Sequence, residues 1–175
     1  ARSPWSNYYD STTATAEDFY RINKLIRERC PDIIINDTGT NMFGMDFDEE
    51  KMVKFLATCN PEISSLDVGM LYMRMRIKFP EEMVKKFGGP ESLKALGKAR
   101  GAIMELLPNN IVYYEGVITL GYTKTEQLAR AMKANNVKPE LEVFNSQSWW
   151  FVDNLIKNNL LTPPYWCQLV FGQDG

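Results

Sequence analysis

Three acidic residues stand at or near the ends of stretches rich in aliphatic side chains. Asp37 follows three isoleucines in IIINDTGT, Asp67 lies near the end of ISSLDVG, and Glu142 lies within PELEVF. Carboxylates at the carboxyl ends of parallel strands gather at one edge of a sheet, which is where α/β proteins bind their ligands. A carboxylate placed there can transfer a proton or attract a cation. The spacing therefore predicts a small-molecule site lined with acids.

Glu142 is the strongest single candidate for catalysis. The alternation in PELEVF places Glu140 and Glu142 on one side of a strand and Leu141 and Val143 on the other. An ionised glutamate without a partner is costly inside a protein, so a glutamate at this position needs either a partner or a role. A buried ion pair is the alternative interpretation.

These acids need strands and covering helices to position them. The run from Ile33 to Ile35 is continuous rather than alternating, which predicts a strand buried on both faces. Thr15 is the predicted N-cap of the first helix. Helices are predicted over residues 17–29, 48–59, 90–107, 123–135 and 146–158, and further strands over 63–68, 110–117, 138–145 and 163–172. This alternation of helices and strands favours an α/β fold with parallel strands.

Composition excludes several classes of protein. The chain has 175 residues, of which 45% are hydrophobic, and this suits one domain with a single core. A net charge of −2 argues against nucleic acid and anionic membranes as partners. Cys30, Cys59 and Cys167 are widely spaced, which argues against disulfides and a zinc cluster. No apolar run is long enough to span a membrane, so a soluble, cytoplasmic protein is predicted.

Four segments resemble the β-keto acid cleavage enzymes, the family that includes 3-keto-5-aminohexanoate cleavage enzyme. They are RERCPDIIINDTGTNMFGM, NPEISSLDVGM, VKPELEVFN and LLTPPYWCQLVFGQDG. The resemblance covers nearly the whole chain except residues 79–107, which we predict to be an insertion. It implies a (β/α)8 TIM barrel, of which this chain is a central fragment covering strands three to seven. It also implies a homo-oligomer, with a tetramer as the expected form.

The resemblance implies a retro-Claisen type of acyl exchange. A β-keto acid and acetyl-CoA would give acetoacetyl-CoA and a new carbonyl or CoA product, with Glu142 as the catalytic residue. The residues that would contact the substrate are Arg2, Asp37, Thr38, Thr40 and Asp67. Thr38 agrees with the family's Ser-Thr-Gly-Gly-like turn, whereas Asp37 and Thr40 depart from it.

Two of these departures add negative charge. Asp37 lies in the family's keto acid turn, and Asp67 stands where the family has Thr or Asn. Together they predict a pocket for a β-keto acid that carries an amino or trimethylammonium group, with Trp5, Tyr8 or Tyr9 adding cation–π attraction. The alternatives are a capping role for Asp37 and a solvated carboxylate at Asp67. Arg74, Arg76 and Lys78 are either a solvated face or contacts for CoA phosphates.

The resemblance also implies zinc, bound by a His-x-His pair and carboxylates. This chain contains no His and opens with Ala1-Arg2, as though cut just after that pair. The metal ligands are therefore expected in flanking sequence, and none in this chain. The competing hypothesis is a non-catalytic open α/β domain that binds a small molecule and is complete as written. A His-x-His encoded upstream of Ala1 would favour the enzyme, and a start codon would favour the binding domain.

Overall fold

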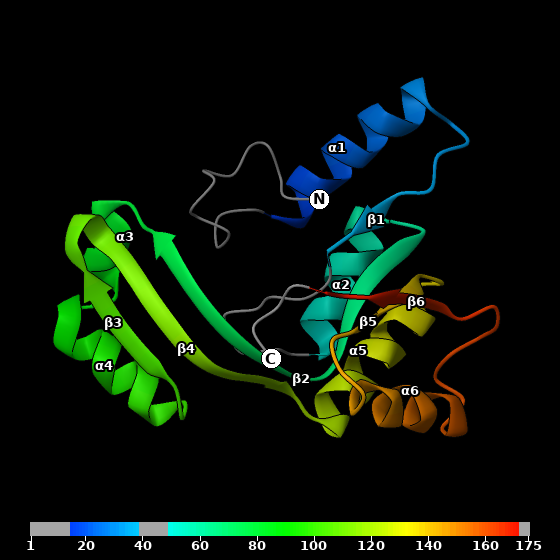
Figure 1. Cartoon of the computed structure of the whole chain (residues 1–175). Coiled ribbons are helices and arrows are strands. Elements are labelled where there is room, and N and C mark those ends of the chain that lie inside the picture. Colours follow the sequence, from blue (N-terminus) through cyan, green and yellow to red (C-terminus); the bar gives the residue numbers. More distant parts are fainter. Residues whose placement is uncertain (1–14, 39–48, 172–175) are drawn as a thin grey trace.

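One long strand, β2 (Ile63–Lys78), belongs to both a parallel half and an antiparallel half of the sheet (Figure 1). The structure is a computed structural model that describes residues 15–38 and 49–171. Its strands form an open, six-stranded sheet in the order β3-β4-β2-β5-β6, with β1 also paired to β2. The first part of β2 has parallel neighbours and the second part an antiparallel neighbour. The described chain is therefore a mixed α/β fold.

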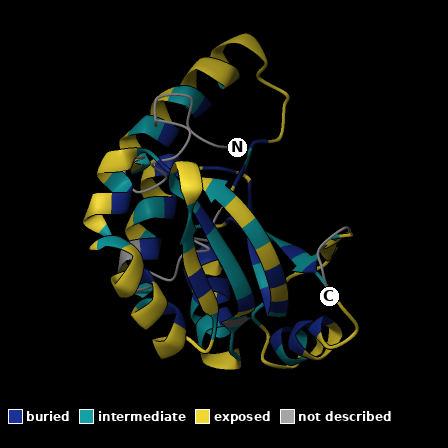
Figure 2. Cartoon of the chain, turned by 60° about the vertical axis from the view of Figure 1, so that its left-hand side comes forward, coloured by how far each residue is buried: buried dark blue, intermediate teal, exposed yellow. Residues whose placement is uncertain are grey.

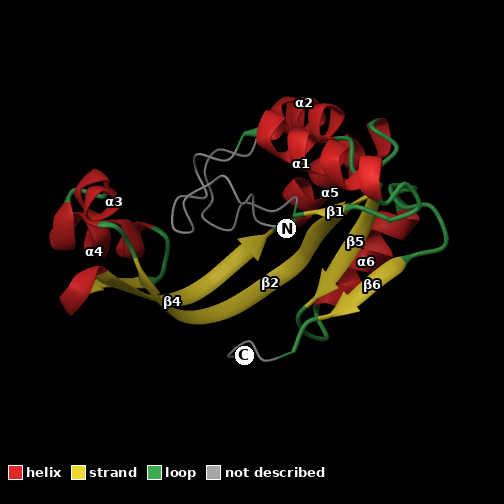
Figure 3. Cartoon of the chain, turned by 90° about the horizontal axis from the view of Figure 1, so that it is seen from above, coloured by secondary structure: helices red, strands yellow, loops and turns green. Residues whose placement is uncertain are grey.

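The parallel half has helices on one face (Figure 3). Strands β1 (Asn36–Asp37), β5 (Lys138–Val143) and β6 (Trp166–Leu169) run parallel to β2. The helices that pack on them are α2 (Glu49–Cys59), α5 (Tyr122–Ala134) and α6 (Ser148–Lys157). Alternate strand residues enter the core between the layers, namely Leu66, Val68, Leu141 and Val143. None of the described helices lies on the opposite face of these strands, which we call the helix-free face.

Helix α1 (Ala16–Arg29) begins as its sequence predicts. Thr15 caps it, because the Thr15 hydroxyl accepts from the Asp18 backbone N–H and the Asp18 carboxylate accepts from the Thr15 N–H in return. Phe19 attaches the helix to α2 through an edge-to-face contact with Phe55 at 5.4 Å between ring centroids.

The three isoleucines before β1 are not a strand buried on both faces. Ile33 and Ile34 are 51% and 58% exposed, and only Ile35 is buried, at 6%. Strand β1 begins at Asn36, after the isoleucines, and pairs only with β2 among the described strands. The prediction was wrong because a continuous apolar run is buried only when neighbours cover both faces, and no described element covers Ile33 and Ile34.

The antiparallel half forms an arm, which we define as residues 70–120. It comprises the second part of β2, α3 (Glu81–Lys86), α4 (Gly89–Ala99), β3 (Ile103–Leu107), a 3-10 turn (Pro108–Asn110) and β4 (Ile111–Leu120). The arm projects away from α2, α5 and α6 (Figure 1). It has a core of its own, made by Phe79, Val84, Leu93, Met104 and Val112.

The arm corrects two predictions. Strand β4 pairs antiparallel with β2 from Gly69 opposite Leu120 onward, so the segment 110–117 is not a parallel strand of a barrel. The helix predicted over 90–107 ends at Ala99, and the chain returns as β3. Gly101, with φ +65°, turns the backbone where no ordinary helix can continue.

Gly69 marks the junction between the two halves. Its φ of +97° lies outside the strand region and shifts the alternation of side chains by one position. Leu66 and Val68 are covered before it, whereas Leu71 and Met73 are covered after it. Figure 3 shows α3 and α4 on the same side of the bent strands as α1 and α2. The helix-free face therefore continues from Asp67 onto the arm.

Replacing Gly69 with Ala is expected to destabilise the full-length protein by about 1–3 kcal/mol. The backbone conformation is strained for Ala, and a Cβ would lie 3.3 Å from the Cδ2 atom of Phe151. Urea unfolding measures the loss. Gly89→Ala is the matched control, since Gly89 also has a positive φ but a Cβ there meets nothing within 4 Å. Equal losses in both variants would contradict a role for Phe151 crowding.

Candidate active site

The candidate site lies on the helix-free face of the parallel strands. Strand register places Ser65 opposite Glu140 and Asp67 opposite Glu142. On the far side of β5, Gln168 of β6 is opposite Glu142. Because β5 ends at Val143, Glu142 stands at the carboxyl end of its strand, as predicted. Asp67 lies beside it where the parallel pairing of β2 with β5 ends, but β2 itself runs on to Lys78, so the prediction that this strand ends at residue 68 was wrong. The alternation predicted for Glu140 and Glu142 is also present, since Leu141 and Val143 are buried in the helix-covered core.

Hydrogen bonds hold the neighbouring pair on this face, Ser65 and Glu140, which lies two residues before Asp67 and Glu142. The Asn36 amide donates to Glu140 Oε2 at 2.5 Å, and the Ser65 hydroxyl donates to Thr38 Oγ1 at 3.3 Å. These contacts tie β1 to β2 and to β5 across the same face. The Asn36 Oδ1 atom is buried and has no hydrogen-bond partner among the described residues. Sequence reasoning missed Ser65 and Asn36, whose place on this face follows from strand register.

Asp67 and Glu142 are the pair best placed for chemistry. Neighbouring strands are about 4.8 Å apart, so the two carboxylates leave the sheet side by side. A carboxylate near a substrate carbon can remove and return a proton, and a second carboxylate beside it favours a cationic group. Both side chains are partly buried, which strengthens such interactions relative to water.

Asp37 faces the other way. Its side chain is buried, with the residue 2% exposed, and Asp37 Oδ2 accepts a hydrogen bond of 2.7 Å from Asn23 Nδ2 of α1. Asn23 also donates to the Cys59 carbonyl at 3.0 Å. Register puts Asp37 opposite Ser64, one position away from Ser65 on the helix-free face. Asp37 therefore joins β1 to the helix layer and does not share a pocket with Asp67.

Burial governs the titration of this cluster. It raises the pKa of the Asp37 carboxyl, and the hydrogen bond from Asn23 opposes that rise. Burial also raises the pKa of the Cys59 thiol to about 12, with the charge of Asp37 acting in the same direction. Cys59 is therefore a neutral, buried thiol and not a nucleophile.

Asp37→Asn is expected to improve stability relative to the native protein as pH rises. A carboxyl with a raised pKa binds its proton more tightly in the folded state, so its contribution to stability falls as pH climbs through that pKa. Asn cannot ionise and can still accept from Asn23. Urea unfolding of the full-length protein between about pH 4 and about pH 7 measures the difference. A variant that is equally weakened at every pH would contradict this reasoning.

The other predicted contacts fall in different places. Thr38 follows β1 and bonds Ser65, so it borders the site. Arg2 and Thr40 lie outside the described residues, as do Trp5, Tyr8 and Tyr9. Their predicted roles stay predictions.

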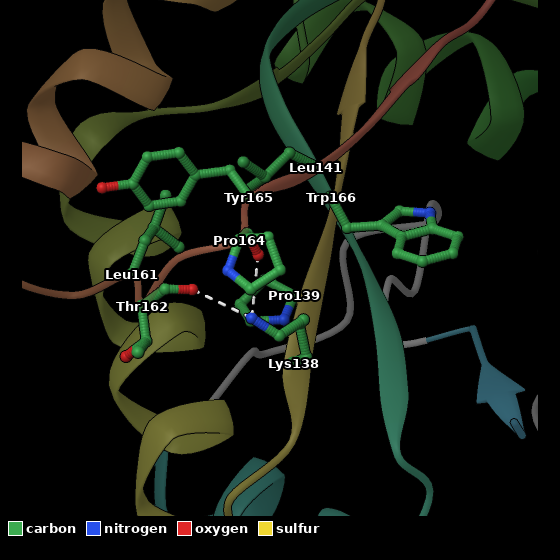
Figure 4. Close-up of a pocket in the computed structure, with 8 residues that line it drawn as sticks. All are labelled: Lys138, Pro139, Leu141, Leu161, Thr162, Pro164, Tyr165 and Trp166. Atoms are coloured by element: carbon green, nitrogen blue, oxygen red, sulfur yellow. Dashed lines mark hydrogen bonds between the residues drawn. The ribbon is translucent and has the colours of Figure 1, made fainter.

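A small hollow near the amino ends of β5 and β6 belongs to the scaffold (Figure 4). The Lys138 ammonium donates to the carbonyl oxygens of Thr162 and Pro164, at 2.9 Å each. Tyr165 and Trp166 extend to opposite sides of the chain as it enters β6 (Figure 4). This cluster anchors the loop before β6 and lies at the opposite end of the strands from Glu142.

The described residues do not provide a ligand set for a zinc ion. The chain contains no His, and no group of three or more Cys, Asp or Glu side chains that could hold a metal occurs in residues 15–38 and 49–171. The acids of the helix-free face are interleaved with Ser65, Asn36 and Gln168 and are better suited to organic polar groups. None of the described helices is long and apolar enough to cross a membrane.

Comparison with known proteins identifies the family. The model of the beta-keto acid cleavage enzyme family matches residues 7–175. No curated protein matches the chain. The family match includes both halves of the described structure and every strand of the helix-free face. The chain therefore belongs to the β-keto acid cleavage enzyme family.

Proposed function

We propose that the full-length protein cleaves a β-keto acid by exchanging acyl groups with acetyl-CoA. Family membership supports β-keto acid cleavage. The observation that carries the assignment to this chain is the pairing of Glu142, at the carboxyl end of β5, with Asp67, where the parallel pairing of β2 and β5 ends. This is the edge of the sheet where α/β enzymes place their catalytic groups.

The proposed acyl exchange forms one carbon–carbon bond and breaks another. The carbon between the keto and carboxylate groups carries the most acidic C–H bond of a β-keto acid, and Glu142 takes its proton. That carbon then bonds to the acetyl carbonyl, and the CoA thiolate leaves. The thiolate attacks the original keto carbon, whose bond to the central carbon breaks, and Glu142 returns its proton to the central carbon. The products are acetoacetate and a CoA ester of the substrate's own acyl group, so acetoacetyl-CoA is not the expected product.

The second carboxylate supports a cationic substrate. Asp67 lies beside Glu142 and not on the helix side with Asp37, so the charge on this face comes from Asp67, Glu140 and Glu142. An amino or trimethylammonium group on the keto acid complements this charge. Gln168 and Ser65 add uncharged polar groups that suit carbonyl or carboxylate oxygens.

We also propose that these strands are part of a larger barrel. Strands β1 and β6 each pair with one neighbour only among the described strands. Large apolar side chains are exposed along the two edges, namely Ile33, Ile34, Trp166 and Leu169. Further barrel strands would cover them, and residues outside the described ranges would hold the family's zinc. A homo-oligomeric, cytoplasmic enzyme is the expected form.

Isotopic labelling tests the reaction directly. The full-length protein is incubated with acetyl-CoA labelled in its acetyl group and with an amino-substituted β-keto acid. The label is expected in acetoacetate, and an unlabelled CoA ester of the substrate's acyl group is expected to appear at the same rate. Label found in a CoA ester other than acetyl-CoA would refute acyl exchange. Cleavage of the keto acid without acetyl-CoA would also refute it.

A further inference from the structure

The arm carries a basic stripe on the helix-free face. Arg74, Arg76 and Lys78 occupy alternate positions of β2 and are exposed, whereas Met75 and Ile77 between them are partly buried. Because alternate residues of a strand share a face, the three cations point the same way. Figure 2 shows the same alternation as exposed and buried bands along the strands. No residue of this stripe takes part in the proposed proton transfer.

The stripe borders a hollow of about 450 Å³ that is lined by Arg74, Met75, Arg76 and Tyr113. The Arg76 guanidinium lies 5.7 Å from the centre of the Tyr113 ring, which orients it over the hollow's aromatic wall. Among the described residues, Arg76 and Lys78 form no ion pair. A planar aromatic wall with adjacent guanidinium groups suits a planar base with phosphates.

Of the two acidic neighbours on the arm, one is already engaged. Glu115 lies opposite Arg74 in the register and accepts hydrogen bonds from the hydroxyls of Tyr72 and Tyr113. These two bonds lower the pKa of the Glu115 carboxyl, so its charge is present but shared with two phenols. Glu105 of β3 is opposite Tyr113. On the arm's part of the helix-free face, the three cations outnumber these two carboxylates.

The stripe and the candidate site share one strand. Arg74 follows Asp67 by seven residues, which is at most roughly 23 Å along β2, and the bend at Gly69 shortens the path. In acetyl-CoA the reacting thioester and the phosphates lie at opposite ends of the long pantetheine chain. A thioester at Glu142 can therefore extend along β2 with its phosphates toward the arm.

We propose that the arm's hollow binds the phosphate-bearing nucleotide end of CoA, with Arg76 as its principal contact. This inference rests on the proposed acyl exchange for the identity of the co-substrate. It assigns a role to the arm, because the proton transfer proposed at Glu142 involves no residue of the arm. Arg76 and Arg74 would hold phosphate oxygens by charge-assisted hydrogen bonds, with Lys78 beside them as a further positive charge.

Truncated thioesters test the proposal. In the full-length enzyme, Arg76→Met is expected to lower kcat/KM for acetyl-CoA about tenfold or more, mainly through KM. The same variant is expected to keep the native kcat/KM for S-acetylpantetheine, which lacks the nucleotide. Lys98→Met is the matched control, because it removes one positive charge from α4 on the arm's other layer. An equal loss for both thioesters, or no loss for acetyl-CoA, overturns the proposal.

Direct binding separates this inference from the proposed reaction. Calorimetry with adenosine 3′,5′-bisphosphate, the nucleotide end alone, needs no turnover. Native binding that weakens in Arg76→Met and survives in Lys98→Met supports the site even if acyl exchange fails. Arg76→Lys, which keeps the charge but loses the planar fork, is expected to be intermediate. Absent native binding, or equal binding of inorganic phosphate alone, overturns it.

Discussion

Glu142→Gln in the full-length enzyme is expected to lower kcat by about 10²–10⁴-fold while changing the KM for the keto acid little. Gln has nearly the shape of Glu and keeps the strand intact, but it cannot accept a proton from carbon. Glu142 stands at the end of β5 beside Asp67, where a substrate carbon can reach it. Steady-state rates of acetoacetate formation measure the effect.

Glu140→Gln is the matched control for this experiment. Glu140 lies two residues earlier on the same strand and the same face, so the chemical change is identical. Its carboxylate already accepts a hydrogen bond from Asn36, and Gln can accept the same bond. A loss of less than about tenfold is therefore expected. Equal losses in the two variants would show that general negative charge on the face matters, and not a proton transfer at Glu142.

Local patterns predicted the elements in which one signal dominates. The capping residue Thr15 and the 3.6-residue period fixed α1, and the period-2 alternation of PELEVF fixed the two faces of β5. In both cases the sequence within a single element decides the outcome. The segments that resemble the family were likewise local, and the family match bears them out.

The arm was not predicted because the helical spacing in segment 90–107 was given more weight than the strand and turn patterns on either side of it. The run LYMRMRIK alternates apolar and polar side chains, which is the pattern of a half-exposed strand, and it forms the second part of β2. Asn109 and Asn110 both have positive φ, which is typical of a tight hairpin turn, and β3 and β4 flank them. Helical spacing in the segment 90–107 is real only as far as Ala99.

The direction of Asp37 depended on a neighbour rather than on its own segment. One residue separates the two faces of a strand, and β1 contains only Asn36 and Asp37. Its pairing with Ile63 and Ser64 turns Asn36 to the helix-free face and Asp37 to α1. The IIIND run alone carries no signal for that choice.

This placement sharpens the expected charge selectivity. If the helix-free face selects cationic substrates, its acids should control selectivity and a buried acid behind the sheet should not. Asp67 lies on that face, and Asp37 lies behind it. The chain thus offers two aspartates on neighbouring strands with opposite expected outcomes.

Asp67→Thr in the full-length enzyme is expected to lower kcat/KM for an amino-substituted or trimethylammonium β-keto acid by roughly 5- to 30-fold. This corresponds to about 1–2 kcal/mol, as expected for one charge interaction near a protein surface. The kcat/KM for a neutral analogue of similar size should change little, and that for a dicarboxylic analogue should rise because a repulsive charge is removed. The ratio of the three values is the measurement.

Asp37→Asn is the control, and its substrate ranking should equal that of the native enzyme. The Asn23 contact persists in this variant, so α1 and β1 keep their positions. A changed ranking in Asp37→Asn would show that the helix-side acid reaches the substrate. A native enzyme that prefers the neutral analogue, or an Asp67→Thr variant with an unchanged ranking, would refute the cationic substrate. Family membership would stand in both cases, because it depends on the match over residues 7–175 and not on the pocket's charge.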